Sequence, residues 1–355
     1  MLENSITLRP LRLVELLDAA FRIYRRNFLT FIGIMAIMQI PVSLLTLGSS
    51  VVMLQGMGSI LGTGGLPNAQ YFLGMGSTFL LAIISFFLIS GLATAALTRA
   101  IAASSLGGRL GVFDAYRKLG SSVVNLLLSM LLAGLIIIGL CIWLLIPCVG
   151  WFSGLGMILY FGFVIMQLLV PVVVLEKRGP LDALRRVWEL ARRRFWWLLG
   201  LAGVLYLLNL VLVGPAGLAT YLLQQFTLRG GINSMDYVTS TTISTVIQSL
   251  VTLLVSLIYR PLELSVIVLT YFDLRVRSEG FDLALQSMSS TEYPDPVDGI
   301  AAAPATPPQK SLITGMELGY FVAGTLGGFL LLTLVYGLLA IIGFGVTSFL
   351  MGSGL

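Results

Sequence analysis

The sequence contains seven long apolar runs, each long enough to cross a lipid bilayer as one helix. A transmembrane helix needs about 20 mostly apolar residues, because the hydrocarbon core is about 30 Å thick. Charged residues make up 10% of the chain and hydrophobic residues 57%, whereas soluble domains carry about 25% charged residues. The pattern predicts an all-α, polytopic integral membrane protein. The predicted spans are Phe28–Met53, Tyr71–Leu97, Val123–Pro147, Phe152–Leu175, Phe195–Leu223, Ile243–Tyr271 and Tyr320–Leu350.

Basic residues are concentrated on one side of this predicted topology. The N-terminal segment and the connections after the second, fourth and sixth spans hold 19 of the 21 lysines and arginines. The opposite connections hold only Arg229, and Arg260 falls within a span. Basic residues in short loops mark the cytoplasmic side of a membrane protein. We therefore expect a multi-pass protein of the bacterial cytoplasmic (plasma) membrane, with its N-terminus in the cytoplasm and its C-terminus outside.

Three stretches of the sequence share one pattern, at residues 13–34, 111–131 and 179–201. Each has an Asp-Ala pair near a predicted helix start, then a basic cluster, then an apolar helix. Repeated patterns of this kind indicate repeated structural units. The second stretch matches least closely. The pattern predicts a six-helix core of three units, each an amphipathic helix plus a transmembrane hairpin, followed by a seventh, C-terminal transmembrane helix.

The first and third stretches have apolar residues on one helix face and charged residues on the other. Such helices lie in the plane of the membrane interface, where each basic residue contributes about 1 kcal/mol of attraction to anionic head groups. The alternative is that the arginines only set the topology. We do not expect nucleic acid as a partner, because the aromatic residues lie on the lipid side. Candidate head-group ligands are Arg22, Arg25, Arg26, Arg185, Arg186, Arg192, Arg193 and Arg194.

The composition divides the chain into three parts. Residues 1–285 form the predicted six-span membrane domain with its cytoplasmic interfacial helices. Residues 286–315 are rich in proline and alanine, which predicts a disordered cytoplasmic linker. Residues 316–355 hold the C-terminal transmembrane helix. Its Gly324-x-x-x-Gly328 motif allows close helix approach, either docking on the other six spans or pairing in a homodimer or with a protein partner.

One pair of charged residues falls inside a predicted span. Arg260 and Glu263 are three residues apart and share one helix face. Thirteen residues, about 20 Å of helix, separate Arg260 from Asp273. Ionisable residues inside the membrane are candidates for function, so we predict an intramembrane polar site at Arg260 and Glu263. Two alternatives are a structural salt bridge, and a surface helix starting at Pro261 that would place Arg260 at the interface.

Three segments resemble a known family. They are "PLRLVELLDAAFRIYRRNF" (10–28), "GPLDALRRVWELARRRFWWLLG" (179–200) and "YFDLRVRSEGFDLAL" (271–285). Residues 6–285 resemble the glycerophosphoryl diester phosphodiesterase membrane-domain family of bacteria and archaea. The resemblance implies a six-helix all-α membrane domain, which in some members is joined to a soluble phosphodiesterase domain. The 355 residues hold no such catalytic domain and no histidine, on which that chemistry relies, so we do not expect the activity.

The sequence lacks the residue patterns of the common catalytic centres. Without histidine, the chain has no imidazole base or metal ligand. It also has no phosphate-binding loop, nucleophile elbow, zinc-binding helix motif or Cys-x-x-Cys motif. We expect no enzyme activity, no cofactor and no metal. The expected function is a non-catalytic membrane protein that interacts with lipid or acts as an accessory or scaffold. The alternatives are a transporter or lipid-translocation component using Arg260 and Glu263, and an intramembrane enzyme.

Overall fold

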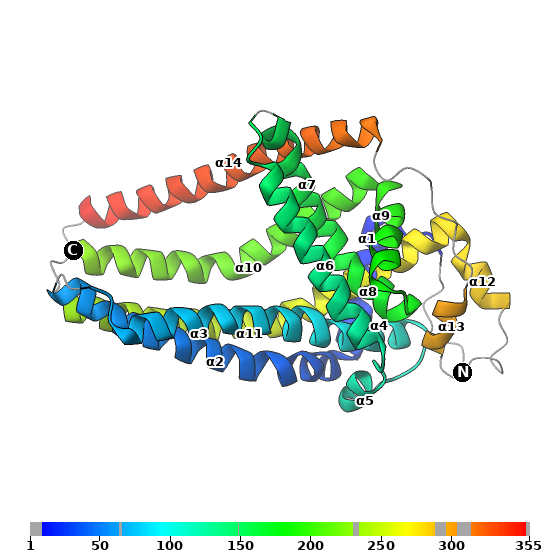
Figure 1. Ribbon diagram of the computed structural model, residues 1–355, viewed down its shortest axis with the longest axis horizontal. Helices are drawn as coiled ribbons and strands as arrows, with labels where there is room; N and C mark the ends of the chain where they lie inside the picture. Colours follow the sequence, from blue (N-terminus) through cyan, green and yellow to red (C-terminus); the bar gives the residue numbers. More distant parts are fainter. Residues whose placement is uncertain are drawn as a thin grey trace.

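The structure is a computed structural model that describes residues 9–63, 66–147, 149–229, 234–287, 296–303 and 314–352. These residues are helical throughout, with short turns and no strand among them (Figure 1). The described part contains seven segments that are long and apolar enough to cross a membrane, which confirms a multi-pass helical membrane protein. They are Phe28–Met57, Ala69–Ser105, Ser122–Trp143, Gly150–Glu176, Phe195–Ala219, Val238–Glu279 and Gly315–Gly337.

The spans differ in how regular their helices are. The uninterrupted long helices are α2 (Phe28–Thr63), α6 (Ser122–Trp143), α10 (Phe195–Arg229), α11 (Ser234–Glu279) and α14 (Gly315–Gly352). The second span contains a π-helical segment, η1 (Phe86–Ala93), between α3 (Ala69–Ser85) and α4 (Thr94–Ser105). The fourth span consists of η2 (Gly150–Gly154), α7 (Leu155–Tyr160), η3 (Phe161–Ile165) and α8 (Met166–Glu176). Segments of π-helix are rare and occur frequently at functional sites.

Helix α11 packs against α2, α10, α1 (Leu13–Arg26) and α4. Helices α2 and α3 form an antiparallel hairpin beside it, along the long axis of the molecule (Figure 1). The hairpin of α6 and α7 crosses these long helices instead of running beside them (Figure 1). The short helices α5 (Val112–Arg117), α9 (Pro180–Arg192), α12 (Phe281–Ser287) and α13 (Pro296–Ala302) lie at one end.

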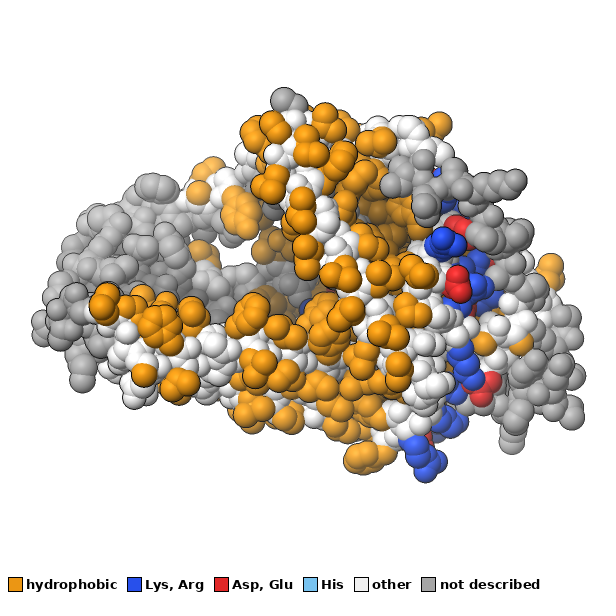
Figure 2. All heavy atoms as spheres, in the orientation of Figure 1, with side chains coloured by type: hydrophobic (Ala, Val, Ile, Leu, Met, Phe, Trp, Pro, Cys, Tyr) orange, Lys and Arg blue, Asp and Glu red, His pale blue; other side chains and the backbone are white. Residues whose placement is uncertain are grey.

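The surface is divided between an apolar body and one charged end. Figure 2 shows lysine, arginine and acidic side chains gathered at the end that carries the short helices, with hydrophobic side chains over much of the remaining described surface. Large apolar side chains on the body are widely exposed, among them Leu29, Phe79 and Val211. Soluble proteins rarely expose apolar surface on this scale. Lipid therefore covers this body in the membrane.

The amphipathic helices α1 and α9 pack on protein with their apolar faces. In α1, Leu16, Ala20 and Ile23 are buried, and the helix lies against α11. In α9, Ala183 and Val187 are buried against α8 and α6. The sequence predicted helices with their apolar faces in lipid. The structure differs because these faces complete the core at the charged end, while Phe21, Leu181 and other apolar side chains at their edges stay exposed.

Part of the predicted linker is a helix. Residues 296–303 include α13, whose Val297 and Ile300 are buried, and α13 lies against α8 and α4. Asp298 accepts from Arg99 at 3.2 Å and pairs with Lys177 at 3.1 Å. The expectation of disorder thus does not hold for 296–303, because these charge pairs and apolar contacts fix the segment. The remaining linker residues 288–295 and 304–313 lie outside the described part.

The last helix, α14, docks on the other spans of its own chain. Thr325 Oγ1 accepts a hydrogen bond from the backbone N–H of Gly156 at 2.7 Å. A Cβ atom on Gly156 would overlap the carbonyl oxygen of Phe321, so only glycine allows this approach. A Cβ on Gly328 would lie 3.0 Å from Leu159 of α7. The glycine-bearing face of α14 is therefore occupied within the chain. Pairing with a second chain through this helix stays a prediction.

Candidate functional site

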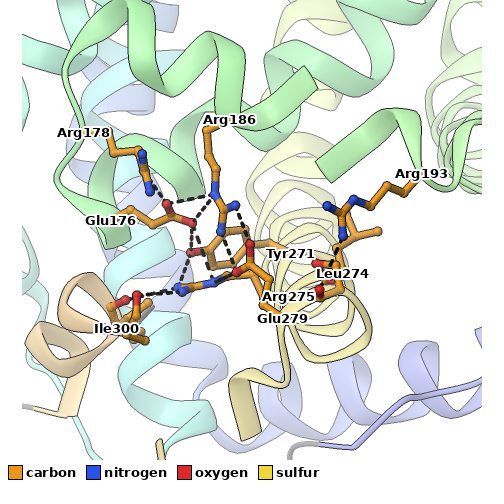
Figure 3. A network of polar contacts seen from close by, with 11 residues as sticks. Glu176, Arg178, Arg186, Arg193, Tyr271, Leu274, Arg275, Glu279 and Ile300 are labelled. Atoms are coloured by element: carbon orange, nitrogen blue, oxygen red, sulfur yellow. Dashed lines mark hydrogen bonds and ion pairs between the residues drawn. The ribbon is translucent and has the colours of Figure 1, made fainter. Parts of the chain in front are cut away.

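Three features of the described residues combine charge with an unusual environment. They are a buried ion network at the charged end, an apolar groove with one arginine, and a cavity beside Arg260. The ion network, here called the charge clamp, consists of Glu176, Arg186, Tyr271, Arg275 and Glu279 (Figure 3).

Arg186 of α9 holds two carboxylates from two other helices. Its Nη1 and Nη2 donate to the two oxygens of Glu279 at 2.5 and 2.6 Å, and its Nε donates to Glu176 at 3.1 and 3.2 Å. Burial opposes the charge on Arg186, but the hydrogen bonds with Glu279 and the charge of Glu176 outweigh it and raise its pKa. Arg186 therefore stays charged and joins α9 to α8 and α11.

Arg275 extends the clamp to α13. Its Nε donates to Glu279 at 3.1 Å, and its Nη1 donates to the hydroxyl of Tyr271 and to the carbonyl of Ile300, each at 3.1 Å. Tyr271 in turn donates to Glu176 at 2.9 Å. Every charged group of the clamp has a charged partner. The clamp therefore offers no free acid or base, and it fastens four helices together.

Asp273 forms a second junction at the same end. Its Oδ1 accepts the backbone N–H of Leu11 at 2.8 Å and its Oδ2 accepts from Arg194 at 3.2 Å. Arg277 donates to both oxygens of Asp273 and also to the carbonyl oxygen of Leu11 at 2.7 Å. Asp273 thus ties the start of α1 and the start of α10 to α11.

The clamp and Asp273 explain the segment "YFDLR" (271–275), which is also part of the resemblance. Tyr271, Asp273 and Arg275 each bind a different neighbouring element. From the sequence, Asp273 was used only as a reference for the depth of Arg260, and no site role was predicted for Tyr271, Arg275, Glu176 or Glu279. The available signal was that these charged residues adjoin long apolar runs. Charges buried there require partners, so such residues are candidates for buried ion pairs.

The structure divides the eight predicted head-group arginines into two groups. On one side, Arg186 is in the clamp, Arg192 pairs with Glu317 at 2.7 Å, and Arg194 pairs with Asp273 and lies 4.6 Å above the Trp197 ring. Each of these faces a carboxylate of the protein. On the other side, five arginines are exposed, and Arg193 among these donates to the Ser278 carbonyl at 3.4 Å. The five exposed arginines are Arg22, Arg25, Arg26, Arg185 and Arg193.

Arg185 stands at an apolar groove of about 430 Å³, here called the α9 groove. The groove lies between α6, α7, η3, α9 and α14, and Arg185 is the only charged residue among the described residues lining it. Arg185 has no ion pair within the described part of the chain. The lining is Leu132, Ile136, Leu140, Met157, Tyr160, Phe161, Ile165, Leu181, Leu184, Arg185, Trp188 and Phe321.

Arg260 and Glu263 line a second cavity of about 320 Å³, here called the Arg260 cavity. Arg260 Nη1 donates to Glu263 Oε2 at 3.2 Å. The Arg260 side chain is 53% exposed and that of Glu263 is 10% exposed. Helix α11 runs without a break through Pro261, so no separate surface helix begins there.

Comparison with protein family models, with curated proteins and with solved structures found no match. Among the described residues, no three histidine, cysteine, aspartate or glutamate side chains gather as metal ligands. The structure thus defines the class, a multi-pass helical membrane protein with a charged end.

Proposed function

We propose that this protein is a non-catalytic membrane protein that binds an anionic phospholipid in the α9 groove, with Arg185 facing the head group. The observation that carries the proposal is the single unpaired cation at the edge of an otherwise apolar groove. Other arginines of the same region, Arg186 and Arg192, are held by carboxylates of the protein. Arg185 is therefore the α9 arginine that is both beside the groove and available to a ligand.

Both parts of a phospholipid, its acyl chains and its phosphate, match this groove. Leucine, isoleucine and aromatic side chains line its length, and each CH₂ group buried there contributes about 0.8 kcal/mol. The guanidinium of Arg185 has planar donors that fit phosphate oxygens. Trp188, also in the lining, is of a type enriched at the membrane interface.

The proposal includes a place in the cell and a topology. The excess of basic residues in alternate connections supports the bacterial cytoplasmic membrane, with the charged end in the cytoplasm and the C-terminus outside. The saturated charge clamp supports a non-catalytic protein. The resemblance to the glycerophosphoryl diester phosphodiesterase membrane-domain family stays a prediction, since no family model matches the chain. An accessory or scaffold role with a protein partner also stays a prediction.

The test measures bound lipid on the full chain in nanodiscs of mixed phosphatidylglycerol and phosphatidylcholine, by native mass spectrometry. We expect Arg185→Gln to lower the retained phosphatidylglycerol about fivefold, since one basic residue near the surface is worth about 1 kcal/mol. The matched control is Arg117→Gln on α5. Arg117 is also exposed but pairs with Asp114 at 3.3 Å and lies outside the groove.

A groove-filling variant separates this site from general surface attraction. Ile136→Trp places a bulky ring in the groove lining and should release the retained lipid while leaving every arginine in place. Equal loss of phosphatidylglycerol in Arg185→Gln and Arg117→Gln, with no loss in Ile136→Trp, would show that the lipid is held by diffuse surface charge and would refute the proposal.

A further inference from the structure

We infer that the Arg260 cavity is a binding site for a phosphate group inside the membrane-spanning part of the protein, with Arg260 as its ligand and Glu263 as an internal carboxylate that competes with the phosphate for the guanidinium. The cavity and the α9 groove are lined by different residues. The inference therefore goes beyond the proposed function and does not rest on it.

Part of the cavity wall is formed where the helices are irregular. Phe86, Ile89 and Ser90 come from the π-helical segment η1, and Gly162 comes from η3. Directly after η1, Thr94 donates its hydroxyl to the carbonyl of Ile89 at 2.8 Å, five residues back. Two π-helical segments thus meet at one cavity, and widened turns of this kind are frequent at functional sites.

The cavity lies away from the charged end. Arg260 precedes Asp273 by thirteen residues, about 20 Å along the continuous helix α11. On the N-terminal side of Arg260, α11 is part of the same candidate span, which begins at Val238. Arg260 therefore lies at the depth of the hydrocarbon core, where a charged side chain is costly unless it is paired or faces a polar cavity.

Glu263 accepts from only part of the hydrogen-bond donors of the Arg260 guanidinium. An arginine has five N–H donors in a planar fork, and only Nη1 of Arg260 has an acceptor within the described residues. The Arg260 side chain is half-exposed and lines the cavity, together with the polar side chains of Ser90, Thr94 and Gln167. The remaining donors are available to an acceptor that enters the cavity.

A phosphate group matches this arrangement. The guanidinium fork binds phosphate oxygens through two parallel hydrogen bonds, and a volume of about 320 Å³ is at the lower end of the range for small-molecule sites. The head group of a membrane lipid and a water-soluble phosphate ester share this chemistry. Because Glu263 competes with the ligand for the same guanidinium, the two residues should affect binding in opposite directions.

The experiment uses the full chain with Arg185→Gln, so that lipid in the α9 groove does not contribute. Isothermal titration measures the binding of two probes, dihexanoyl phosphatidic acid as a lipid phosphate and glycerol 3-phosphate as a water-soluble phosphate. We expect at least one probe to bind, and Arg260→Gln to weaken it about tenfold, the value of a charge-assisted hydrogen bond. We expect Glu263→Gln, which keeps an oxygen acceptor beside Arg260 but removes the competing charge, to strengthen the binding.

The two probes identify the source of the phosphate. Binding of phosphatidic acid alone assigns the cavity to lipid, and binding of glycerol 3-phosphate assigns it to a soluble ester. Absence of binding by both probes overturns the inference. So does binding that Arg260→Gln and Glu263→Gln leave unchanged or weaken equally, which is the result for a purely structural salt bridge. Arg117→Gln, which removes an exposed arginine outside the cavity lining, controls for a general loss of positive charge and should leave the binding unchanged.

Discussion

Arg186 and Glu279 form two parallel hydrogen bonds of 2.5 and 2.6 Å, although 93 positions separate them in the chain. Both side chains are 3% exposed. One residue earlier in α9, Arg185 is exposed and has no ion pair among the described residues. The two adjacent arginines thus have opposite environments, and they should respond differently to the same substitution.

We expect Arg186→Ala to lower the free energy of unfolding by about 3–5 kcal/mol, because it removes the buried cation that two buried carboxylates, Glu176 and Glu279, share. Arg185→Ala should change it by less than about 0.5 kcal/mol, as a surface substitution does. Thermal unfolding in detergent measures both. Equal stability of the two variants would contradict the role of the clamp.

Asp273→Ala should loosen the attachment of α1 to α11. The substitution removes the acceptor of the Leu11 N–H and the partner of Arg194, at a cost of about 2–3 kcal/mol for hydrogen bonds to a charged group. Hydrogen exchange of residues 13–26 should become faster, while that of the α2–α3 hairpin stays unchanged. Asp182→Ala, an exposed carboxylate on α9, is the control. Unchanged hydrogen-exchange protection of α1 in Asp273→Ala would show that Asp273 does not hold α1 on α11.

Gly156→Ala should displace α14 from α7. The added methyl group overlaps the carbonyl oxygen of Phe321, and overpacking of this kind costs about 1–3 kcal/mol. Gly327→Ala on α14 meets nothing within 4 Å and serves as the control.

Cysteine crosslinking reports the position of α14. Leu159→Cys and Gly328→Cys, in a chain whose native cysteines are replaced by serine, place two thiols at the contact between α7 and α14. We expect a crosslink within one chain, lost in Gly156→Ala and kept in Gly327→Ala. A crosslink between two chains instead would favour the dimer predicted from Gly324 and Gly328.

Alkaline pH should weaken the attachment of α5 to α2 through Tyr116. Its hydroxyl donates to the Ile34 carbonyl at 2.6 Å, and burial raises its pKa from 10.0 to about 12. Because the unfolded chain loses this proton at lower pH than the folded protein, the stabilisation is complete below pH 10 and is lost as pH rises to about 12.

Tyr116→Phe isolates this contribution. Its free energy of unfolding should be lower than that of the natural protein by about 1 kcal/mol at pH 8, through the lost hydrogen bond, and the difference should shrink at pH 12. Denaturant titrations at the two pH values measure it. A difference that stays constant with pH would show that Tyr116 does not titrate in this range.

Part of the site was predictable from the sequence and part was not. The sequence placed Arg260 and Glu263 together, because residues three apart on a helix are neighbours whatever the tertiary structure. It did not reveal that η1 and η3 meet beside them, since nothing local distinguishes a π-helical turn in an apolar run. It also assigned Arg186 and Arg192 to head groups, whereas Glu279 and Glu317 hold them.

The sequence by itself determined that seven helices can cross a membrane. Whether a segment can span the bilayer depends on its own length and hydropathy, which do not require tertiary contacts. The tertiary structure alone decided which charges are paired. Arg186 finds Glu279, and Arg192 finds Glu317 at a separation of 125 positions. The physical reason is that buried charges need partners in space, and only packing brings distant residues together. By the same packing, Arg185 and Arg260 keep donors available for a ligand.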